Sequence, residues 1–319
     1  MNIYKLRNKE KELLIGEILK FTHIKNINNR QLLEKCNPIN KVLCKIEGLT
    51  ELYTIFKKGN HSFIIIDNLP ITNTIPNVFQ LIAIGLSKFL GEAFQYKEQN
   101  FGKLNGHLTP IEKFSGIENT GQGNGSFGWH SDDAILTKDL RTEWIQLLCE
   151  DNTANTVTQI TLVDDIINKL TAKDIEILLE ERFYFRSPHS FNLNSNSINR
   201  KGSILSLING KYEINYSSYN CLPLDRLDKE AIFLIRKIAK IADEHAIDLM
   251  LKPGQAVIFN NNRVIHRRNK VSGNRSLYRT YIKKDLSSLH NVKGNKENIF
   301  SIFDLYKYME NINVIQFNN

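Results

Sequence analysis

The sequence predicts an α+β fold in which a core of β-strands is covered by helices. Short apolar runs rich in β-branched residues alternate along the chain with longer segments of helical periodicity, and this mixture favours the class. The chain has 319 residues, of which 41% are hydrophobic and 24% charged. A chain of this size and composition buries a substantial core and is neither collagen-like nor largely disordered. Its length is compatible with one elaborated domain or with two ordinary ones.

The N-terminal half predicts two helices with a strand between them. Apolar residues at helical spacing predict a helix over residues 10–21, and a second helix is expected after Pro76. Residues 63–66 form a β-branched apolar run that ends in turn-forming residues, as a buried strand does. The stretch 115–128 contains five glycines and predicts a mobile loop that leads into Trp129.

The C-terminal half predicts further strands and three helices. Residues 144–148, 157–162 and 255–259 have the composition and alternation of strands. Two short helices follow residue 162, and Thr171 with Asp174 three residues later predicts a capping box at the start of the second. A longer helix is expected over residues 225–245. We expect its buried stripe to consist of apolar residues at helical spacing, namely Ile232, Phe233, Ile235, Ile238 and Ile241.

Charge and cysteine content narrow the possible classes of protein. The 42 Lys and Arg residues exceed the 34 Asp and Glu residues by a formal net charge of +8, but they are scattered, so we expect no nucleic-acid partner. The cysteines Cys36, Cys44, Cys149 and Cys221 lack the close paired spacing of a zinc or redox site and are expected to be reduced, buried thiols. The sequence shows no leader and no apolar run that would span a membrane, so we expect a cytoplasmic protein that is not membrane-bound.

A candidate metal site begins with the His-x-Asp sequence formed by His130 and Asp132. Side chains two residues apart on an extended segment project from the same face, so both can hold one ion. A second histidine, His266, follows the strand-like residues 256–259 and a polar turn. Two histidines and one carboxylate on one face of a metal are typical of non-haem iron(II) oxygenases.

Two arginines follow His266 in an alternating segment. Arg275 and Arg279 are four residues apart, so both can face the same cavity from one strand. A co-substrate with a remote carboxylate requires a fixed and permanently charged partner, and the guanidinium group supplies one.

The ordered set of Trp129 to Asp132, Asn261 to His266, Arg275 and Arg279 resembles the iron(II)/2-oxoglutarate-dependent oxygenases of the clavaminate synthase and taurine dioxygenase type. Within these, the sequence is most similar to hydroxylases of free lysine, arginine or asparagine. The resemblance extends from about Phe63 to Ile282. It implies a single oxygenase domain with a double-stranded β-helix (jelly-roll) core over about 61–285. Residues 1–60 would form a helical extension and 286–319 a C-terminal tail.

The resemblance also implies roles for individual residues. His130, Asp132 and His266 match the iron(II) ligands, and Arg279 matches the arginine that binds the distal carboxylate of 2-oxoglutarate. Arg275 matches a second arginine near this co-substrate. Thr158 matches a threonine that hydrogen-bonds the same carboxylate.

Candidate substrate contacts are less sharply defined. The resemblance directs attention to polar residues on and before the loop that precedes the first ligand, here Gln99, Gln122 and Ser126. Arg267 stands where family members commonly have glycine. The larger, charged side chain would narrow the entrance near the metal or change its charge. Residues 214–220 contain no carboxylate, whereas relatives that bind a guanidinium or a long amine often carry an acidic pair there. Arginine is therefore a less favoured substrate.

The function implied by the resemblance is hydroxylation of an unactivated C–H bond of a small molecule, with an amino acid or a derivative as the expected substrate. Dioxygen and 2-oxoglutarate would be consumed, and succinate and CO2 released. An intact Asp132 favours hydroxylation or desaturation over halogenation. The alternatives are a desaturase or epoxidase with the same site and a catalytically silent cupin-like binding protein, against which the intact metal and arginine positions argue. The oligomeric state stays open.

Overall fold

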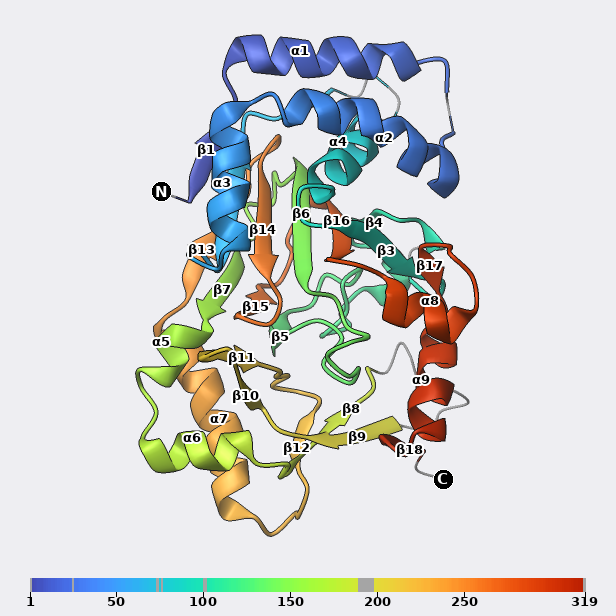
Figure 1. The fold of residues 1–319 in the computed structure, drawn as a ribbon. Coiled ribbons are helices and arrows are strands. Elements are labelled where there is room, and N and C mark those ends of the chain that lie inside the picture. The colour runs from blue at the N-terminus through green and yellow to red at the C-terminus, as the bar shows by residue number, and fades with distance from the viewer. Residues whose placement is uncertain are drawn as a thin grey trace.

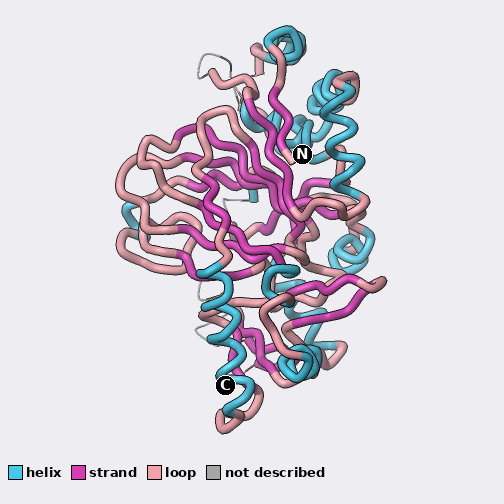
Figure 2. Tube along the Cα trace, turned by 90° about the vertical axis from the view of Figure 1, so that its left-hand side faces the viewer, coloured by secondary structure: helices cyan, strands magenta, loops and turns pink. Residues whose placement is uncertain are grey.

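The computed structural model describes residues 2–317 except 25, 73–74, 76, 100–101 and 189–197. Strands occupy the middle of the molecule, the N-terminal helices cover one end, and a smaller sheet with its own helices forms the other end (Figure 1). Figure 2, turned by 90°, shows the same strands stacked in layers with helices around them.

The larger barrel sheet has eight strands, and its neighbours are mostly far apart in sequence. Its order is β1-β2-β14-β6-β16-β3-β17, with β4 paired to β16 outside this path. The strands are β1 (Ile3–Lys5), β2 (Phe63–Asp67), β3 (Glu92–Tyr96), β4 (Gly106–Leu108), β6 (Trp144–Asp151), β14 (Ala256–Asn260), β16 (Ser276–Lys283) and β17 (Ile299–Phe300).

The smaller barrel sheet has the order β13-β7-β15-β5. Its strands are β5 (Phe127–His130), β7 (Thr158–Leu162), β13 (Ile247–Leu249) and β15 (Val264–Arg268). The two barrel sheets enclose a common hydrophobic cluster, which is the packing of a jelly roll. The predicted fold class is therefore confirmed.

Two further sheets extend the barrel at the end opposite the N-terminal helices. One has the order β12-β8-β9-β18 and the other is the hairpin β10-β11. Their strands are β8 (Phe183–Arg186), β9 (Ile198–Gly202), β10 (Leu205–Ile208), β11 (Lys211–Ile214), β12 (Cys221–Pro223) and β18 (Ile315–Phe317).

The helices form three groups around the sheets. At one end, α4 packs on β6 and β16, and α2 packs on α4. At the other end, α7 contacts β12 and the two short helices beside it, while α9 contacts α8 and β18. The helices are α1 (Asn8–Ile18), α2 (Asn29–Leu43), α3 (Glu47–Lys57), α4 (Val78–Ser87), α5 (Val163–Ile167), α6 (Ala172–Leu179), α7 (Lys229–Glu244), α8 (Ser287–Lys293) and α9 (Ile302–Asn311), with 3-10 turns at Leu19–Phe21 and Glu112–Phe114.

Alternation along the larger sheet divides the interior into two cores. Successive strand residues point to opposite faces. On β16, Tyr278 and Ile282 join the cluster beneath the N-terminal helices, whereas Leu277 and Tyr281 join the cluster inside the barrel. The same sheet therefore holds the helical layer on its outer face and presents side chains to the barrel interior on the other.

Most elements predicted from periodicity are present. The helix expected over 10–21 is α1 with its 3-10 extension, and the predicted capping box is formed, with Asp174 N donating to Thr171 Oγ1 at 3.2 Å. The helix expected over 225–245 is α7. Its predicted buried stripe is wrong at Phe233, which is 59% exposed, because Ala231 and Leu234 occupy the buried face instead.

The cysteines are free, as expected, and all but Cys44 are buried. No helix within the described part of the chain has the length and apolar character needed to cross a membrane.

Candidate metal centre and adjoining cavities

The structure brings His130, Asp132 and His266 together inside the barrel. His130 ends β5 and pairs directly with His266 of β15 in an antiparallel ladder. Asp132 Oδ1 lies 3.1 Å from His130 Nε2 and 3.6 Å from His266 Nε2. One possible ligand atom from each residue lies within 4.8 Å of the others, so the three side chains can hold one metal ion.

The donor set fits a divalent transition metal. His130 Nδ1 lies 2.7 Å from the carbonyl oxygen of Gly128. This contact fixes the proton on Nδ1, so the lone pair of Nε2 is available to bind a metal. That Nε2 atom is buried and has no hydrogen-bond partner among the described residues. Burial, and after it the neighbouring His130, lowers the pKa of His266 to about 3, so this imidazole is neutral near neutral pH. Two imidazoles and one carboxylate match the facial triad of non-haem iron(II) sites.

The carboxylate of Asp132 is oriented by contacts to one of its two oxygens. Its Oδ2 accepts hydrogen bonds from Tyr281 Oη at 2.9 Å and from Arg279 Nη1 at 3.2 Å. Burial by itself would raise the pKa of Asp132, but His130 and Arg279 together lower it below its ordinary value. The other oxygen, Oδ1, faces the two imidazoles and is available as a negatively charged metal ligand.

Asn261 fixes the backbone of the segment that carries Asp132. It is fully buried at the end of β14, and its Oδ1 accepts a hydrogen bond from the backbone N–H of Asp132 at 2.9 Å. Its Nδ2 donates to the carbonyl oxygens of Asp132 at 2.9 Å and of Thr142 at 3.1 Å. One amide group therefore joins the metal-binding segment to the strands that carry His266.

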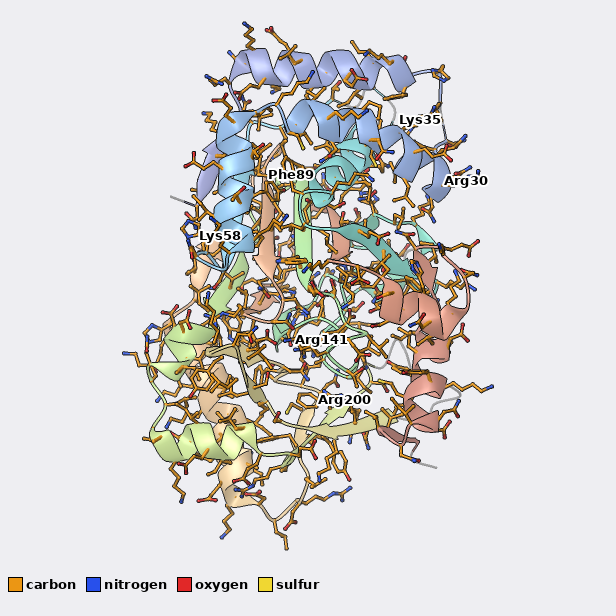
Figure 3. The ribbon with its side chains drawn as sticks, in the orientation of Figure 1. Arg30, Lys35, Lys58, Phe89, Arg141 and Arg200 are labelled. Atoms are coloured by element: carbon orange, nitrogen blue, oxygen red, sulfur yellow. The ribbon has the colours of Figure 1, made fainter. Side chains whose placement is uncertain are left out.

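Two interior arginines support the chain just after Asp132. Figure 3 shows Arg141 and Arg200 in the middle of the molecule, between the barrel and the sheet that contains β9. Arg200 donates to the carbonyl oxygens of Ile135 at 2.7 Å and Ala134 at 3.1 Å, and Arg141 donates to Asn262 Oδ1 at 3.1 Å. Burial lowers the pKa of each guanidinium to about 10, which leaves both charged.

Two cavities meet at the triad. The larger has a volume of about 340 Å³, and the smaller has a volume of about 40 Å³. His130, Asp132 and Arg279 line both, whereas Thr158 and Arg275 line only the smaller one. A metal held by the triad would therefore face two separate binding regions.

The two arginines predicted beside the metal are both buried but differ in their surroundings. Arg275 Nη2 donates to Thr158 Oγ1 at 3.2 Å in the smaller cavity. Burial, with Arg268 nearby, lowers the pKa of Arg275 to about 9, so it remains protonated near neutral pH. Arg279 instead reaches Asp132, and its Nη2 donates to Gln99 Oε1 at 2.6 Å in the larger cavity. This placement differs from the expected one, in which Arg279 was the residue closest to a carboxylate held with Thr158.

The predicted substrate contacts are only partly brought together. Gln99 and Gln122 line the larger cavity. Ser126 is exposed, donates to Glu118 Oε1 at 2.9 Å and does not line this cavity, so the structure does not bring it together with the other predicted contacts. Arg267 is also outside the larger cavity: it pairs with Asp243 of α7, and its guanidinium lies 4.6 Å from the centre of the Trp129 ring. Arg267 does line the smaller cavity beside the metal-binding residues, so its effect on the entrance near the metal stays a prediction.

The glycine-rich loop that precedes β5 is tied down in this structure. Arg268 donates to the carbonyl oxygens of Gly121 at 3.3 Å and Gly125 at 2.5 Å. Asn119 Oδ1 accepts the N–H of Gly128 at 2.9 Å. The loop therefore forms a defined wall of both cavities.

Several residues of the site were not predicted from the sequence. Tyr281 and Asn261 stood inside motifs that were considered, but their contacts to Asp132 depend on the strand register. Arg186, Asp133 and Tyr306 also line the larger cavity. Of these, only Tyr281 had a usable signal, since it shares a strand face with Arg279.

Comparisons with known proteins agree with this geometry. Residues 195–281 match the family model described as "Taurine catabolism dioxygenase TauD, TfdA family". A search of curated protein sequences finds no match.

Solved structures match over almost the whole chain. Asparagine oxygenase in complex with Fe(II), 2S,3S-3-hydroxyasparagine and succinate has a TM-score of 0.83 at 16% identity and covers 94% of this chain and 99% of its own. The non-heme iron oxygenase OrfP in complex with Fe, succinate and (3R,4R)-dihydroxy-L-Arg has a TM-score of 0.82 at 18% identity, with 94% and 100% covered. OrfP with Fe and alpha-ketoglutaric acid has a TM-score of 0.81 at 19% identity, with 94% and 99% covered. The chain thus has the fold of these non-haem iron oxygenases, and its segment 195–281 matches the TauD/TfdA dioxygenase family.

Proposed function

We propose that this chain is an iron(II)- and 2-oxoglutarate-dependent dioxygenase that hydroxylates an unactivated C–H bond of an amino acid or an amino-acid derivative. The observation that carries the proposal is the buried convergence of His130, Asp132 and His266 where two cavities meet, with Arg279 lining both cavities and Arg275 only the smaller one. Overall, one substrate C–H bond, 2-oxoglutarate and O2 become a C–OH group, succinate and CO2.

The triad would hold the iron through His130, His266 and Oδ1 of Asp132. When bound, iron(II) supplies the activation of O2 that a protein side chain cannot provide. Tyr281 and Arg279 keep the second oxygen of Asp132 occupied, and the Gly128 carbonyl sets the ring of His130. The ligand side chains are thereby oriented before metal binding, which limits the reorganisation that binding requires.

We assign the distal carboxylate of 2-oxoglutarate to Arg275 and Thr158. Both lie in the smaller cavity and already share a hydrogen bond, so a carboxylate between them would accept from a guanidinium and a hydroxyl. The resemblance implies the principal role for Arg279, and this assignment reverses the order of the two arginines. The reversal is supported by the distance between Arg275 and Thr158 and by the contact of Arg279 with Gln99.

We assign the main-chain groups of the substrate to Arg279 and Gln99 in the larger cavity. Their side chains are joined by a hydrogen bond of 2.6 Å, so a carboxylate on Arg279 would lie beside Gln99. A guanidinium that is fixed by Asp132 and stacked over the Tyr281 ring provides a rigid anchor for it. Positioning then decides the product, because the reaction would occur at the carbon held nearest the metal.

Substrate-dependent succinate release tests the proposal. The protein is loaded anaerobically with iron(II) and 2-oxoglutarate, mixed with free amino acids and then with carrier-bound ones, and exposed to O2. We expect succinate in stoichiometric ratio to a product that has gained one oxygen atom. His130→Ala and Asp132→Ala are expected to abolish both.

Matched variants separate loss of chemistry from loss of folding. Arg236→Gln, on the exposed face of α7 and outside both cavities, serves as a control that retains turnover. Unimpaired turnover in His130→Ala or Asp132→Ala would contradict the proposal. A product that has lost hydrogen without gaining oxygen would indicate desaturation at the same site, and binding without succinate would indicate a silent binding protein.

A further inference from the structure

The C-terminal helix α9 contributes to the wall of the larger cavity, although it follows the barrel and the segment that matches the family model. Ile302 and Tyr306, one turn apart on α9, both line this cavity together with the metal-binding residues. Figure 1 shows α9 beside the barrel, on the side toward which β3 and β17 lie. The helix is thus a structural part of the substrate region.

The cavity wall itself fixes the start of α9. Glu98 lines the larger cavity, and its two oxygens accept hydrogen bonds from Ser301 Oγ at 2.8 Å and from the backbone N–H of Ile302 at 3.0 Å. The next residue, Gln99, contacts Arg279. Two adjacent residues therefore connect the proposed carboxylate anchor to α9, which restricts where Tyr306 can lie.

Tyr306 has a polar atom that the protein does not satisfy. The side chain is fully buried, and its hydroxyl has no hydrogen-bond partner among the residues that the structure describes. Buried polar atoms in folded proteins nearly always have a partner, so an orphaned hydroxyl on a cavity wall points to a ligand. Burial, and then the charge of Asp133, raises the pKa of Tyr306, which keeps the hydroxyl protonated and able to donate.

The carboxylates that line the cavity are already engaged by the protein. Glu98 holds α9, Asp132 is bound by Tyr281 and Arg279, and Asp133 Oδ2 accepts from Tyr96 Oη at 2.8 Å. Arg186 lines the same cavity and has no ion-pair partner within the described part of the chain. Tyr306 and Arg186 therefore offer hydrogen-bond donors to an oxygen on a substrate side chain, and Arg186 adds a positive charge.

We propose that Tyr306 is a substrate-binding residue that donates a hydrogen bond to an oxygen on the substrate side chain, and that the enzyme selects amino acids with a side-chain amide or carboxylate over those with a guanidinium or ammonium group. This inference rests on the proposed function and extends it to the substrate class. A cationic side chain would meet the like charge of Arg186, and the lining carboxylates already accept hydrogen bonds from the protein.

Calorimetric binding to the protein loaded with iron(II) and 2-oxoglutarate in the absence of O2 tests the inference. The probes are L-asparagine, L-glutamine, L-aspartate and L-glutamate, with L-arginine and L-lysine as cations and L-norvaline as a side chain without oxygen. We expect at least one amide or carboxylate probe to bind more tightly than both cations. In Tyr306→Phe its Kd should rise by roughly three- to tenfold, the usual effect of losing one hydrogen bond.

The matched control is Tyr53→Phe. Tyr53 is also buried with an unpartnered hydroxyl, but it lies in the separate core beneath the N-terminal helices. We expect Tyr53→Phe to leave every Kd unchanged and Tyr306→Phe to leave the Kd of L-norvaline and of 2-oxoglutarate unchanged. Equal weakening for L-norvaline, no weakening for any probe, or tightest binding of L-arginine or L-lysine would each overturn the inference.

Failure of the proposed function gives a different pattern. If 2-oxoglutarate binds and no amino acid does, the proposed substrate class falls and this inference falls with it. If neither iron(II) nor 2-oxoglutarate binds, the proposed oxygenase activity itself is wrong. Weaker binding that is confined to Tyr306→Phe and to the probes with a side-chain oxygen supports both the proposed function and this inference.

Discussion

Tyr281 supports a metal ligand without being able to bind the metal itself. Its hydroxyl donates to Asp132 Oδ2 at 2.9 Å, and it lies on the barrel face of β16. Tyr281→Phe keeps the ring and removes this hydrogen bond, so only Arg279 still restrains Asp132 Oδ2. We expect the affinity for Mn(II) or iron(II), measured by anaerobic calorimetry, to fall by about tenfold, as is usual when a partner of a metal ligand is removed.

Tyr278→Phe provides the control for this measurement. Tyr278 lies on the same strand but on the opposite face, in the core beneath the N-terminal helices. Its side chain points away from the barrel interior and lines neither cavity, so metal affinity should stay unchanged. Equal losses in the two variants would show that the ring contacts or the strand, rather than the hydroxyl, set the affinity.

The two arginines are expected to separate the two organic ligands. Arg275→Gln removes the charge beside Thr158 and should raise the concentration of 2-oxoglutarate needed for half-maximal turnover by roughly 10- to 100-fold, since hydrogen bonds to charged groups contribute about 1.5–3 kcal/mol. Arg279→Gln should act mainly on the KM of the amino acid. Steady-state succinate assays with each ligand varied in turn measure both effects. The reverse pattern would restore the assignment first expected from the sequence.

At the residue scale, the sequence indicates the ligands more readily than their partners. His130, Asp132 and His266 were predicted because their types and order are restricted by metal chemistry. Asn261 and Tyr281 were not singled out, because their roles depend on contacts with a distant part of the chain. Asn261 is 129 residues away from Asp132, and Tyr281 is 149 residues away from it. Ser126 lies outside the larger cavity, since the type of a polar loop residue carries no information about which side of the loop it faces.

The start of α6 illustrates how a local motif stabilises an element. Thr171 Oγ1 accepts the N–H of Asp174, and Asp174 Oδ2 accepts the N–H of Thr171 at 2.8 Å. Thr171→Ala removes one half of this arrangement and should lower the free energy of unfolding by about 1 kcal/mol. Denaturant unfolding measures the change. Thr153→Ala, at an exposed turn, is the control and should change the free energy by less than about 0.5 kcal/mol.

At the scale of elements, local patterns identified the helices and strands whose signals lie within a few residues. The capping box of α6 and the β-branched run of β2 are of this kind. The segment of α2 was not predicted individually, and it contains Pro38 in its interior. Phe233 was placed on the wrong face of α7 because periodicity does not show which of several apolar stripes meets the sheet. Tertiary packing decides this, and here it selects Ala231 and Leu234.

For the molecule as a whole, thiol accessibility reports how tightly the cores are closed. Burial raises the pKa of Cys36 to about 11 and that of Cys149 to about 12, and Cys221 is also buried. Since thiolates are the reactive form, these thiols should be inert in the native state. We expect Ellman's reagent to label Cys44 alone in the native protein and all four cysteines after unfolding. Rapid native labelling of a second thiol would show that one of the cores opens.

The arrangement of the whole molecule was the part least accessible from local patterns. Neighbouring strands of the larger sheet, such as β2 and β14 or β6 and β16, are separated by more than a third of the chain's length, and their pairing leaves no local signal. The jelly roll was predicted from the resemblance carried by the metal and arginine motifs. The placement of α9 against the larger cavity was not predicted, because residues 286–319 were expected to form only a tail.

The amide of Asn261 couples occupancy of the metal site to the thermal behaviour of the entire barrel. This amide ties the Asp132 segment to the end of β14, so an ion bound to Asp132 also restrains that strand. A ligand that binds only the native state raises the melting temperature. Removing the ion with a chelator should therefore lower the temperature of the main unfolding transition instead of producing an independent early one. A simple melting curve would then serve as a gauge of metallation.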